Sequence, residues 1–523
     1  MKTIYLKIIP IILSVVLVFG SCKKTFLDVN TNPNTLPTAS PNFVFTNALN
    51  TTVGNLNIVT GAFSGEVLQN ETGSYFAAQW TQSSSYILNP TIFAYTFTNG
   101  DFNYFDGIYN NLEDYQYVID NADANEQKAL KGPAKVMKAY LFQKLVDMYG
   151  NVPFSEALQG VKNIAPKFDD QKMIYESLIP LLDSALIDLK ANAFTGALIS
   201  SDIVFSGSNA KWARFANSLK LRILIRQSRI SGRDAYITTE IKKAVAEGSG
   251  FIGAGEDVGV NPGYQATAGK LNPFYERFGY TATGTAQAYN RFPKPTVNLF
   301  NELISRNDTL RLKRIAYAKG GENPNTPGVS TQPEIVANYV GIPYGVGSGY
   351  TAGAVSSVGP AVLIKNQFNR PLYLMIAAES QFLLSEAVLR YGATLGLPNT
   401  AQQYYEQGVR ESFRLNGVPN SITAANALLT GGKSEADWLA SPDKFKAIWL
   451  QKWLAFVNFE GFEAWTEVRR TNYPVIPLSA SSSTGKAPVR FFYPSTELGS
   501  NKANVDAQGT IDVFNTRLFW DVD

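Results

Sequence analysis

A helical period in the positions of the apolar residues constrains the fold more than any other feature of this sequence. Between Lys128 and Gly150, apolar side chains recur at spacings of three and four residues, which aligns them in one stripe along an amphipathic helix. Gly150, with Asn151 and Pro153 behind it, predicts the end of that helix. The same period predicts further helices at 173–190, 211–229, 371–391, 401–416 and 443–457.

Amphipathic helices of this kind bury their apolar stripes by packing against one another. Helices that follow each other in pairs favour a stack of the tetratricopeptide kind. Between about 250 and 370 the period is lost, and Gly, Tyr, Pro, Asn and Thr predominate. A stretch this long is usually functional or disordered, and its aromatic residues argue against disorder. The sequence therefore predicts a mainly α fold, with a tetratricopeptide-like helical stack and a large irregular, loop-rich subdomain.

The N-terminus has the pattern of a bacterial lipoprotein signal peptide. A lysine-bearing start leads into an apolar run over 8–19, which is shorter than the roughly 20 residues that a membrane-spanning helix needs. Two small residues then precede Cys22, the only cysteine of the chain, at the position that is acylated in lipoproteins. We expect that 1–21 are removed and that lipid on Cys22 anchors the protein to a membrane.

The segment behind the signal peptide differs in composition from the rest of the chain. Residues 22–42 are rich in Asn, Thr and Pro and poor in apolar residues, which predicts an extended, lipidated tether. Residues 43–523 then form a single ligand-binding domain, with the irregular subdomain over about 250–370 inside it.

The absence of histidine excludes several classes of enzyme. None of the 523 residues is His, so Ser-His-Asp and Cys-His arrangements, histidine-ligated zinc and an imidazole general base are impossible. An enzyme would have to work through carboxylates, lysine, tyrosine or a bound metal, as carboxylate-based glycosidases do. The formal net charge is +3 and basic residues are interspersed with acids, which argues against the concentrated basic face that nucleic acid requires. We predict no nucleic-acid partner and no cofactor.

Ordered motifs extend over nearly all of the mature chain. The segment 134–158 contains Asp147, Tyr149, Gly150 and Pro153 in a helix-and-turn pattern. Four further segments are WARFANSLKLRILIR at 212–226, PLYLMIAAESQFLLSEAVLRYG at 371–392, QKWLAFVNFEGFEAWTEVRRTNYP at 451–474 and VRFFYPSTELGSNKANVDA at 489–507. Together with the mature start CKKTFLDVNTNPN, this ordered set resembles the SusD/RagB family of nutrient-binding lipoproteins, and in particular its SusD-like branch.

The resemblance implies a mostly helical scaffold that is lipid-anchored at the outer membrane, on the cell surface of a Bacteroidota-type bacterium. Members of the family cap a SusC-like TonB-dependent transporter, usually for glycans and sometimes for peptides, and they are not enzymes. We therefore expect a surface lipoprotein that binds a nutrient oligomer, first of all a glycan, and delivers it to such a transporter. The alternatives are a peptide binder of the same architecture, a carboxylate-based lipoprotein glycoside hydrolase, and a scaffold that only assembles surface complexes.

Glu379 and Glu386 are the pair that a hydrolase would most readily use. They stand seven residues apart on a predicted helix, hence on one face and roughly 10 Å apart along its axis. This exceeds the roughly 5 Å of a retaining pair and lies at the far end of the inverting range. Buried acids on such helices are more often neutralised by arginine, and other predicted helices carry Arg222, Arg226 and Arg414. We expect a structural role for both acids.

Two other acidic groups could be taken for metal sites. In EGFEAWTEVRR at 460–470, acids at spacings of three and four are followed by two arginines, which favours an ion-pair network. Asp101, Asn103 and Asp106 lack the spacing and the terminal Glu of a calcium-binding EF-hand loop. We predict no metal at either place.

Aromatic residues in two loop-rich regions, 70–97 and 264–350, are the candidates for ligand binding. Sugars present C–H patches to aromatic faces and hydroxyl groups to planar polar side chains, so a glycan site needs both kinds of group. Packing in the core is the alternative for each ring, above all for Trp80. The predicted ligand-binding residues are Trp80, Tyr86, Tyr280, Tyr289, Asn290, Arg291, Tyr344 and Tyr350.

Overall fold

The computed structural model describes residues 39–57, 69–83 and 85–522. The signal peptide, Cys22 and most of the tether lie outside the described residues, so what the sequence predicts for them stays a prediction. The first described helix, α2, covers Pro41–Asn57. The last two residues of the predicted tether are therefore helical.

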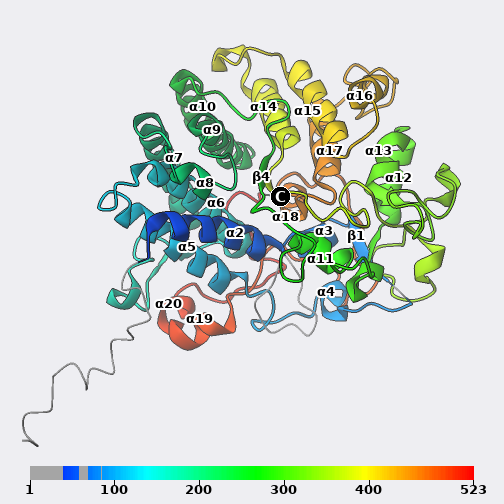
Figure 1. Ribbon diagram of the computed structural model, residues 1–523, viewed down its shortest axis with the longest axis horizontal. Coiled ribbons are helices and arrows are strands. Elements are labelled where there is room, and N and C mark those ends of the chain that lie inside the picture. Colours follow the sequence, from blue (N-terminus) through cyan, green and yellow to red (C-terminus); the bar gives the residue numbers. More distant parts are fainter. Residues whose placement is uncertain (1–38, 58–68, 84, 523) are drawn as a thin grey trace, which may run out of the picture. The chain divides into compact units, whose positions relative to one another are not determined.

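Successive helices pack side by side and form the core of the unit that begins at Pro41 (Figure 1). In the first part of the stack, each of five helices packs against the next. These are α5 (Tyr104–Asn121), α6 (Lys131–Tyr149), α7 (Gln171–Ala191), α9 (Asn209–Arg226) and α10 (Asp234–Glu247). In the second part, α14 packs against α9 and continues the stack. Its helices are α14 (Ala377–Tyr391), α15 (Ala401–Leu415), α16 (Ser421–Leu429), α17 (Lys444–Phe456) and α18 (Gly461–Thr471).

The predicted helices of the stack are confirmed, with one correction at 371–376. The segment predicted as helix over 371–391 starts as strand β8 (Leu372–Met375), which pairs antiparallel with β4 (Val258–Val260), and turns helical only at Ala377. A short apolar run fits a strand and a buried helix equally well, so periodicity alone could not separate the two.

The irregular subdomain contains more regular structure than its sequence indicates. Three short helices lie there: α11 (Pro273–Phe278), α12 (Val297–Ser305) and α13 (Thr309–Ile315). Three further two-stranded antiparallel pairs are β1 (Trp80–Gln82) with β5 (Pro293–Pro295), β6 (Ala316–Tyr317) with β7 (Ser357–Val358), and β2 (Val152–Pro153) with β3 (Phe168–Asp169). Strands β5, β6 and β7 belong to the subdomain, whereas β1 comes from an earlier part of the chain, and β5 lies next to β7.

The remaining elements are short. The other helices are α3 (Gln69–Phe76), α4 (Pro90–Ala94), α8 (Leu198–Ser201), α19 (Ser495–Ser500) and α20 (Lys502–Asp506). Single 3-10 turns cover Lys128–Leu130, Gly160–Lys162, Ala288–Arg291, Val336–Asn338, Ala352–Ala354 and Ala393–Leu395. None of the described helices is long and apolar enough to cross a membrane.

Helices α3 and α18 touch at two glycines. A Cβ atom on Gly73 would collide with the backbone of Gly461, and a Cβ atom on Gly461 would collide with Ser74 and with the backbone of Asn70. The N–H of Phe462 donates to Asn70 Oδ1 at 3.4 Å, across 392 positions of the sequence. Only glycine lets two backbones approach so closely, so this crossing fixes the start of the domain against a helix near its end.

Buried ion pairs join the helices inside the stack. Arg222 binds Glu379 at 2.5 Å, and Arg226 binds both Asp147 and Glu463 at 2.6 Å. These side chains are almost completely buried. The structural role predicted for Glu379 is confirmed, because its carboxylate is paired with arginine and has no access to a substrate.

The second cluster of ion pairs surrounds Glu386. Arg470 binds Glu386 at 2.7 Å and Glu467 at 2.8 Å, and Lys452 binds Glu467 at 2.7 Å. Burial alone would raise the pKa of the Glu386 carboxyl, but Arg470 and Lys452 outweigh burial and hold it well below its usual value. The ion-pair network predicted for 460–470 is therefore confirmed, and so is the structural role of Glu386.

The polar side chains at 101–106 form hydrogen bonds with backbone N–H groups. Asn103 is the N-cap of α5 and accepts the N–H of Asp106, while the Asp101 carboxylate accepts the N–H of Thr98 at 2.6 Å. The cluster is thus a turn followed by a helix cap.

Candidate ligand-binding site

A cavity of about 390 Å³ opens within the irregular subdomain. Side chains from four stretches of chain line it, within 280–294, 317–324, 352–358 and 363–365. Its polar lining consists of Tyr280, Asn290, Arg291, Lys294, Tyr317, Glu322, Ser357 and Lys365. Tyr280, Asn290 and Arg291 are among the residues predicted from the sequence, so the structure brings three of the eight together in one cavity.

Glu322 organises one wall of the cavity. Its carboxylate accepts the hydroxyl of Tyr280, the N–H of Gly328 at 2.7 Å and the N–H of Lys365 at 3.1 Å. Burial, and then the neighbouring Glu322, raise the pKa of the Tyr280 hydroxyl, which therefore stays protonated and donates. The negative charge of Glu322 is thus already stabilised from within the protein.

Lys294 lies in the middle of β5, opposite Thr81 of β1. Its side chain lines the cavity although the residue is only 2% exposed. No carboxylate of the described chain pairs with its ammonium group, and burial lowers the pKa of Lys294 to about 8. A buried ammonium normally has a partner, because three donors and a full charge are costly to desolvate.

An aromatic cluster adjoins the cavity and is centred on the buried ring of Phe292. The ring of Tyr86 lies edge-on at 5.5 Å, the ring of Tyr289 lies at 6.2 Å, and the guanidinium of Arg291 lies 4.9 Å from the Phe292 centroid. Tyr86 is 48% exposed and Arg291 is exposed as well. Three predicted residues from two distant regions therefore meet around one ring that the sequence did not single out.

Strand pairing between β1 and β5 brings the two predicted regions together. Trp80 stands opposite Pro295 and Gln82 opposite Pro293, so 70–97 and 264–350 share one small sheet. Two prolines in three residues conceal β5 in the sequence, since proline cannot donate to a ladder and is confined to edge strands. The same concealment explains why Lys294 was not predicted.

Two predicted residues are core residues. Trp80 is 2% exposed and donates its indole N–H to Asn458 Oδ1 at 3.0 Å, and Tyr344 is 4% exposed and accepts from the hydroxyl of Tyr95 at 3.4 Å. Neither ring presents a face to a ligand, which corrects the expectation that they are free to stack. Tyr350 is half-buried, and its carbonyl accepts the N–H of Ser85 at 2.8 Å.

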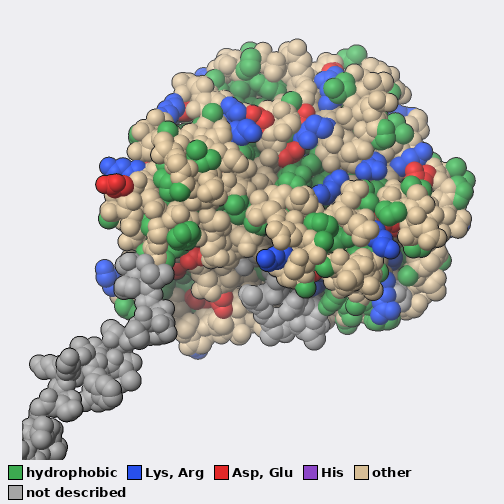
Figure 2. Space-filling model, in the orientation of Figure 1, with side chains coloured by type: hydrophobic (Ala, Val, Ile, Leu, Met, Phe, Trp, Pro, Cys, Tyr) green, Lys and Arg blue, Asp and Glu red, His purple; other side chains and the backbone are tan. Residues whose placement is uncertain are grey.

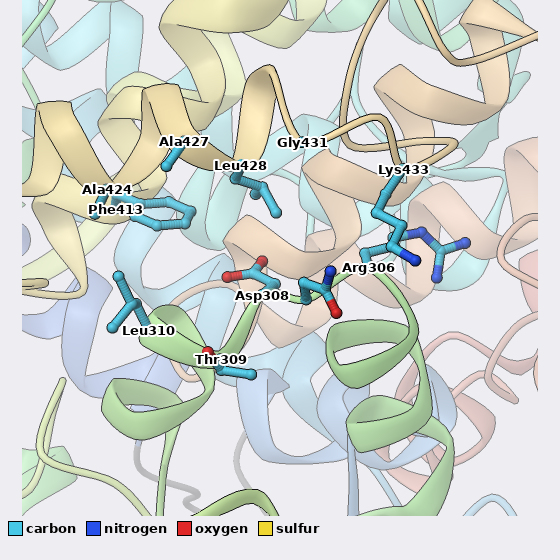
Figure 3. Close-up of a pocket in the computed structure, with 11 residues that line it drawn as sticks. Arg306, Asp308, Thr309, Leu310, Phe413, Ala424, Ala427, Leu428, Gly431 and Lys433 are labelled. Carbon is cyan, nitrogen blue, oxygen red and sulfur yellow. The ribbon is translucent and has the colours of Figure 1, made fainter.

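A second cavity, of about 180 Å³, lies between α13 and α16 (Figure 3). Apolar side chains from α15 and α16 face Asp308, Thr309 and Leu310 across it (Figure 3). Its two less exposed charged groups have partners, because Asp308 accepts from Arg311 at 2.8 Å and Arg306 donates to Glu302 at 2.6 Å, whereas Lys433 is exposed to solvent. This cavity is smaller, and its less exposed charged groups are already paired within the protein.

A third cavity, of about 430 Å³, is lined by Trp465, Arg469 and Phe514, among others. Arg469 donates to the carbonyl groups of Asp147 at 2.9 Å and Val489 at 2.8 Å, and it lies 3.7 Å from the Trp465 ring centroid. The guanidinium of Arg469 is therefore already hydrogen-bonded to backbone carbonyl groups of the protein. The cavity beside Lys294 differs in having a buried cation with neither an ion-pair partner nor a side-chain hydrogen bond in the described chain.

Charged groups are spread over the surface as well. In the face shown in Figure 2, Lys and Arg side chains stand in small groups among neutral side chains, with Asp and Glu between several of them. Within 39–57, 69–83 and 85–522 there is no group of three Asp, Glu, Cys or His side chains that could hold a metal ion.

Comparison with known proteins identifies relatives of this chain. A family model described as starch-binding and associating with the outer membrane, SusD-like, matches residues 33–494. A search among curated proteins gives no match.

Solved structures share the fold. A chitin-binding protein has a TM-score of 0.71 at 24% identity, with 92% of this chain and 100% of that chain covered. A SusD homologue from Bacteroides fragilis has a TM-score of 0.72 at 19% identity, with 92% and 100% covered. A chitin-binding SusD homologue from Flavobacterium johnsoniae has a TM-score of 0.68 at 19% identity, with 92% and 99% covered. The mainly α fold predicted from the sequence is thereby confirmed.

Proposed function

This chain belongs to the SusD-like family of binding proteins that associate with the outer membrane, and from that premise we propose that it binds a nutrient glycan in the cavity beside Lys294. The observation that carries the proposal is that basic side chains without ion-pair partners in the described chain lie beside aromatic rings at one cavity. Tyr86 and Tyr289 supply rings beside the exposed guanidinium of Arg291. Rings next to planar polar groups are what a sugar needs.

The names of the relatives support a glycan over a peptide. The family description refers to starch, and two of the similar structures are chitin-binding proteins. The hydrolase alternative loses support because Glu379 and Glu386 are both buried in ion pairs with arginine. We propose binding without catalysis, followed by delivery to a SusC-like TonB-dependent transporter.

The first test concerns Arg291. Arg291→Ala is expected to weaken glycan binding by tenfold or more, because tenfold corresponds to about 1.4 kcal/mol and a lost charge-assisted hydrogen bond is of that size. The melting temperature should stay unchanged, since Arg291 is exposed. Calorimetric titration with a panel of starch, chitin and acidic oligosaccharides measures the affinity.

Arg410→Ala is the matched control for that test. Arg410 stands on α15, outside the cavity lining, and pairs with Glu406 at 3.0 Å on the surface. Its replacement should leave the affinity as it is. Undiminished binding by the Arg291→Ala protein, or no binding of any oligosaccharide by the native protein, would contradict the proposed function.

A lipid anchor on Cys22 is the second part of the proposal, and it rests on the signal-peptide pattern. Cys22→Ala should release the protein from outer-membrane fractions into soluble fractions, because the signal peptide would then lack its acylation site. Fractionation followed by immunoblotting measures the distribution. If the variant still sediments with outer membranes after a high-salt wash, lipid does not anchor the protein.

A further inference from the structure

The cavity beside Lys294 has an excess of positive charge. Three basic residues line it, Arg291, Lys294 and Lys365, against one acid, Glu322. The carboxylate of Glu322 is occupied by Tyr280, by the N–H of Gly328 and by the N–H of Lys365. In the described part of the chain, none of the three basic side chains forms an ion pair within the structure. The cavity therefore carries a net positive charge that an anionic ligand would neutralise.

Lys294 is the most informative of the three basic residues, because its ammonium group is not stabilised by exposure to water. A lysine on the surface needs no partner, but Lys294 is 2% exposed and sits between two prolines in a strand. Its neighbour across the sheet is Thr81, which offers no charge. Buried cations in proteins are almost always paired, so an ammonium kept here without a partner is typical of a binding group whose partner arrives with the ligand.

The chemical types of Arg291 and Lys294 fit an anionic group with several oxygen atoms. The guanidinium of Arg291 is planar and exposed at the aromatic cluster, whereas the ammonium of Lys294 is a point charge in the buried wall. A carboxylate or a sulfate has several oxygen atoms that accept charge-assisted hydrogen bonds from groups of both kinds. The hydroxyl groups of a neutral sugar would accept hydrogen bonds but leave the positive charge unbalanced.

We propose, on the basis of the glycan-binding function above, that this cavity selects sugars with an anionic substituent, a carboxylate or a sulfate, over neutral sugars. Lys294 binds the anionic group in the buried wall of the cavity, and Arg291 binds it from the exposed side. The aromatic rings around Phe292 hold the neighbouring part of the oligomer.

The test compares oligomers that differ only in charge. Calorimetric titration is carried out with galacturonate oligomers and their methyl esters, with hyaluronan oligomers and their methyl esters, and with sulfated chondroitin oligomers and their desulfated, esterified forms. Starch and chitin oligomers serve as neutral references. At least one charged oligomer is expected to bind tenfold or more tightly than its neutral counterpart. A preference within the galacturonate and hyaluronan series identifies a carboxylate as the substituent, and a preference within the chondroitin series alone identifies a sulfate.

Lys294→Met removes the buried charge while keeping a side chain of similar length. In this variant the preference for the charged oligomer should fall to twofold or less, while the melting temperature does not fall. Lys242→Met, which removes an exposed lysine of α10, is the control and should keep the preference. Lys294→Arg keeps the charge and should retain part of the preference.

The outcomes separate this inference from the proposed function. If starch or chitin oligomers bind as tightly as every charged oligomer, or if the Lys294→Met protein keeps its preference, selection of anionic sugars is wrong while glycan binding stands. If no oligosaccharide binds at all, both proposals fail. If Arg291→Ala weakens neutral and charged oligomers equally, Arg291 binds the sugar rather than its anionic group, and the inference fails in that part.

Discussion

Arg470→Met is expected to lower the free energy of unfolding by about 3–5 kcal/mol, the usual cost of removing one partner from a buried ion pair. Arg470 is completely buried and bridges Glu386 at 2.7 Å and Glu467 at 2.8 Å. Without it, Glu386 would keep only the partly exposed Arg390 at 3.2 Å and Lys452 at 3.9 Å as cations in the described chain, and Glu467 would keep Lys452 at 2.7 Å. Urea unfolding followed by tryptophan fluorescence measures the change in midpoint.

Arg410→Met provides the matched control for that measurement. Arg410 pairs with Glu406 at 3.0 Å, with both side chains about a quarter exposed, and surface pairs of this kind contribute about 1 kcal/mol or less. The two variants carry the same chemical change, so the difference between them isolates the effect of burial. Equal shifts in the two proteins would mean that the network around Glu386 does not stabilise the stack.

Lys294→Met is expected to raise the free energy of unfolding of the ligand-free protein by about 3 kcal/mol at pH 7. Burial lowers the pKa of Lys294 from 10.5 to about 8, and each pKa unit corresponds to about 1.36 kcal/mol. Below pH 8 the folded protein holds an ammonium that water would solvate better, and methionine removes that cost. Most substitutions of buried residues destabilise a protein, so an increase in stability would show that the buried charge of Lys294 destabilises the ligand-free protein.

The pH dependence of that effect has a definite direction. Between pH 8 and 10.5 the unfolded chain keeps the proton while the folded protein releases it, so native stability rises with pH in this window. The advantage of the Lys294→Met variant should therefore shrink from pH 8 upwards and vanish near pH 10.5. Urea unfolding of both proteins at pH 7 and pH 10 tests this. A less stable variant at pH 7 would show that Lys294 has a partner in the ligand-free protein.

The stack could be predicted from the sequence because its helices are long and periodic. The apolar stripe of 128–150 corresponds to a 3-10 turn followed by α6. This helix ends at Tyr149, directly before Gly150, where the sequence predicts its end. Short elements of the irregular subdomain could not be predicted in the same way. Helix α12 has nine residues and α13 has seven, which is too few turns for a period to stand out from the surrounding loops.

The candidate site was predicted only in part, because residue type alone does not show whether a side chain is buried. The search for aromatic rings beside planar polar side chains identified Tyr280, Asn290 and Arg291, which line one cavity. The same criterion also selected Trp80, because a tryptophan that fills the core and one that stacks on a sugar have the same sequence signal. Lys294 carried no signal at all, since its burial depends on a strand pairing between segments more than 200 positions apart.

The glycine crossing of α3 and α18 has a consequence for how the chain comes to be folded. The contact closes a loop of nearly the whole domain, and contacts of such long range form late and slow the folding of a protein. Because residues from Pro41 onwards form one compact unit, no earlier stopping point offers a finished core. A nascent or truncated chain that ends before Gly461 therefore leaves α3 without its partner and open to proteases.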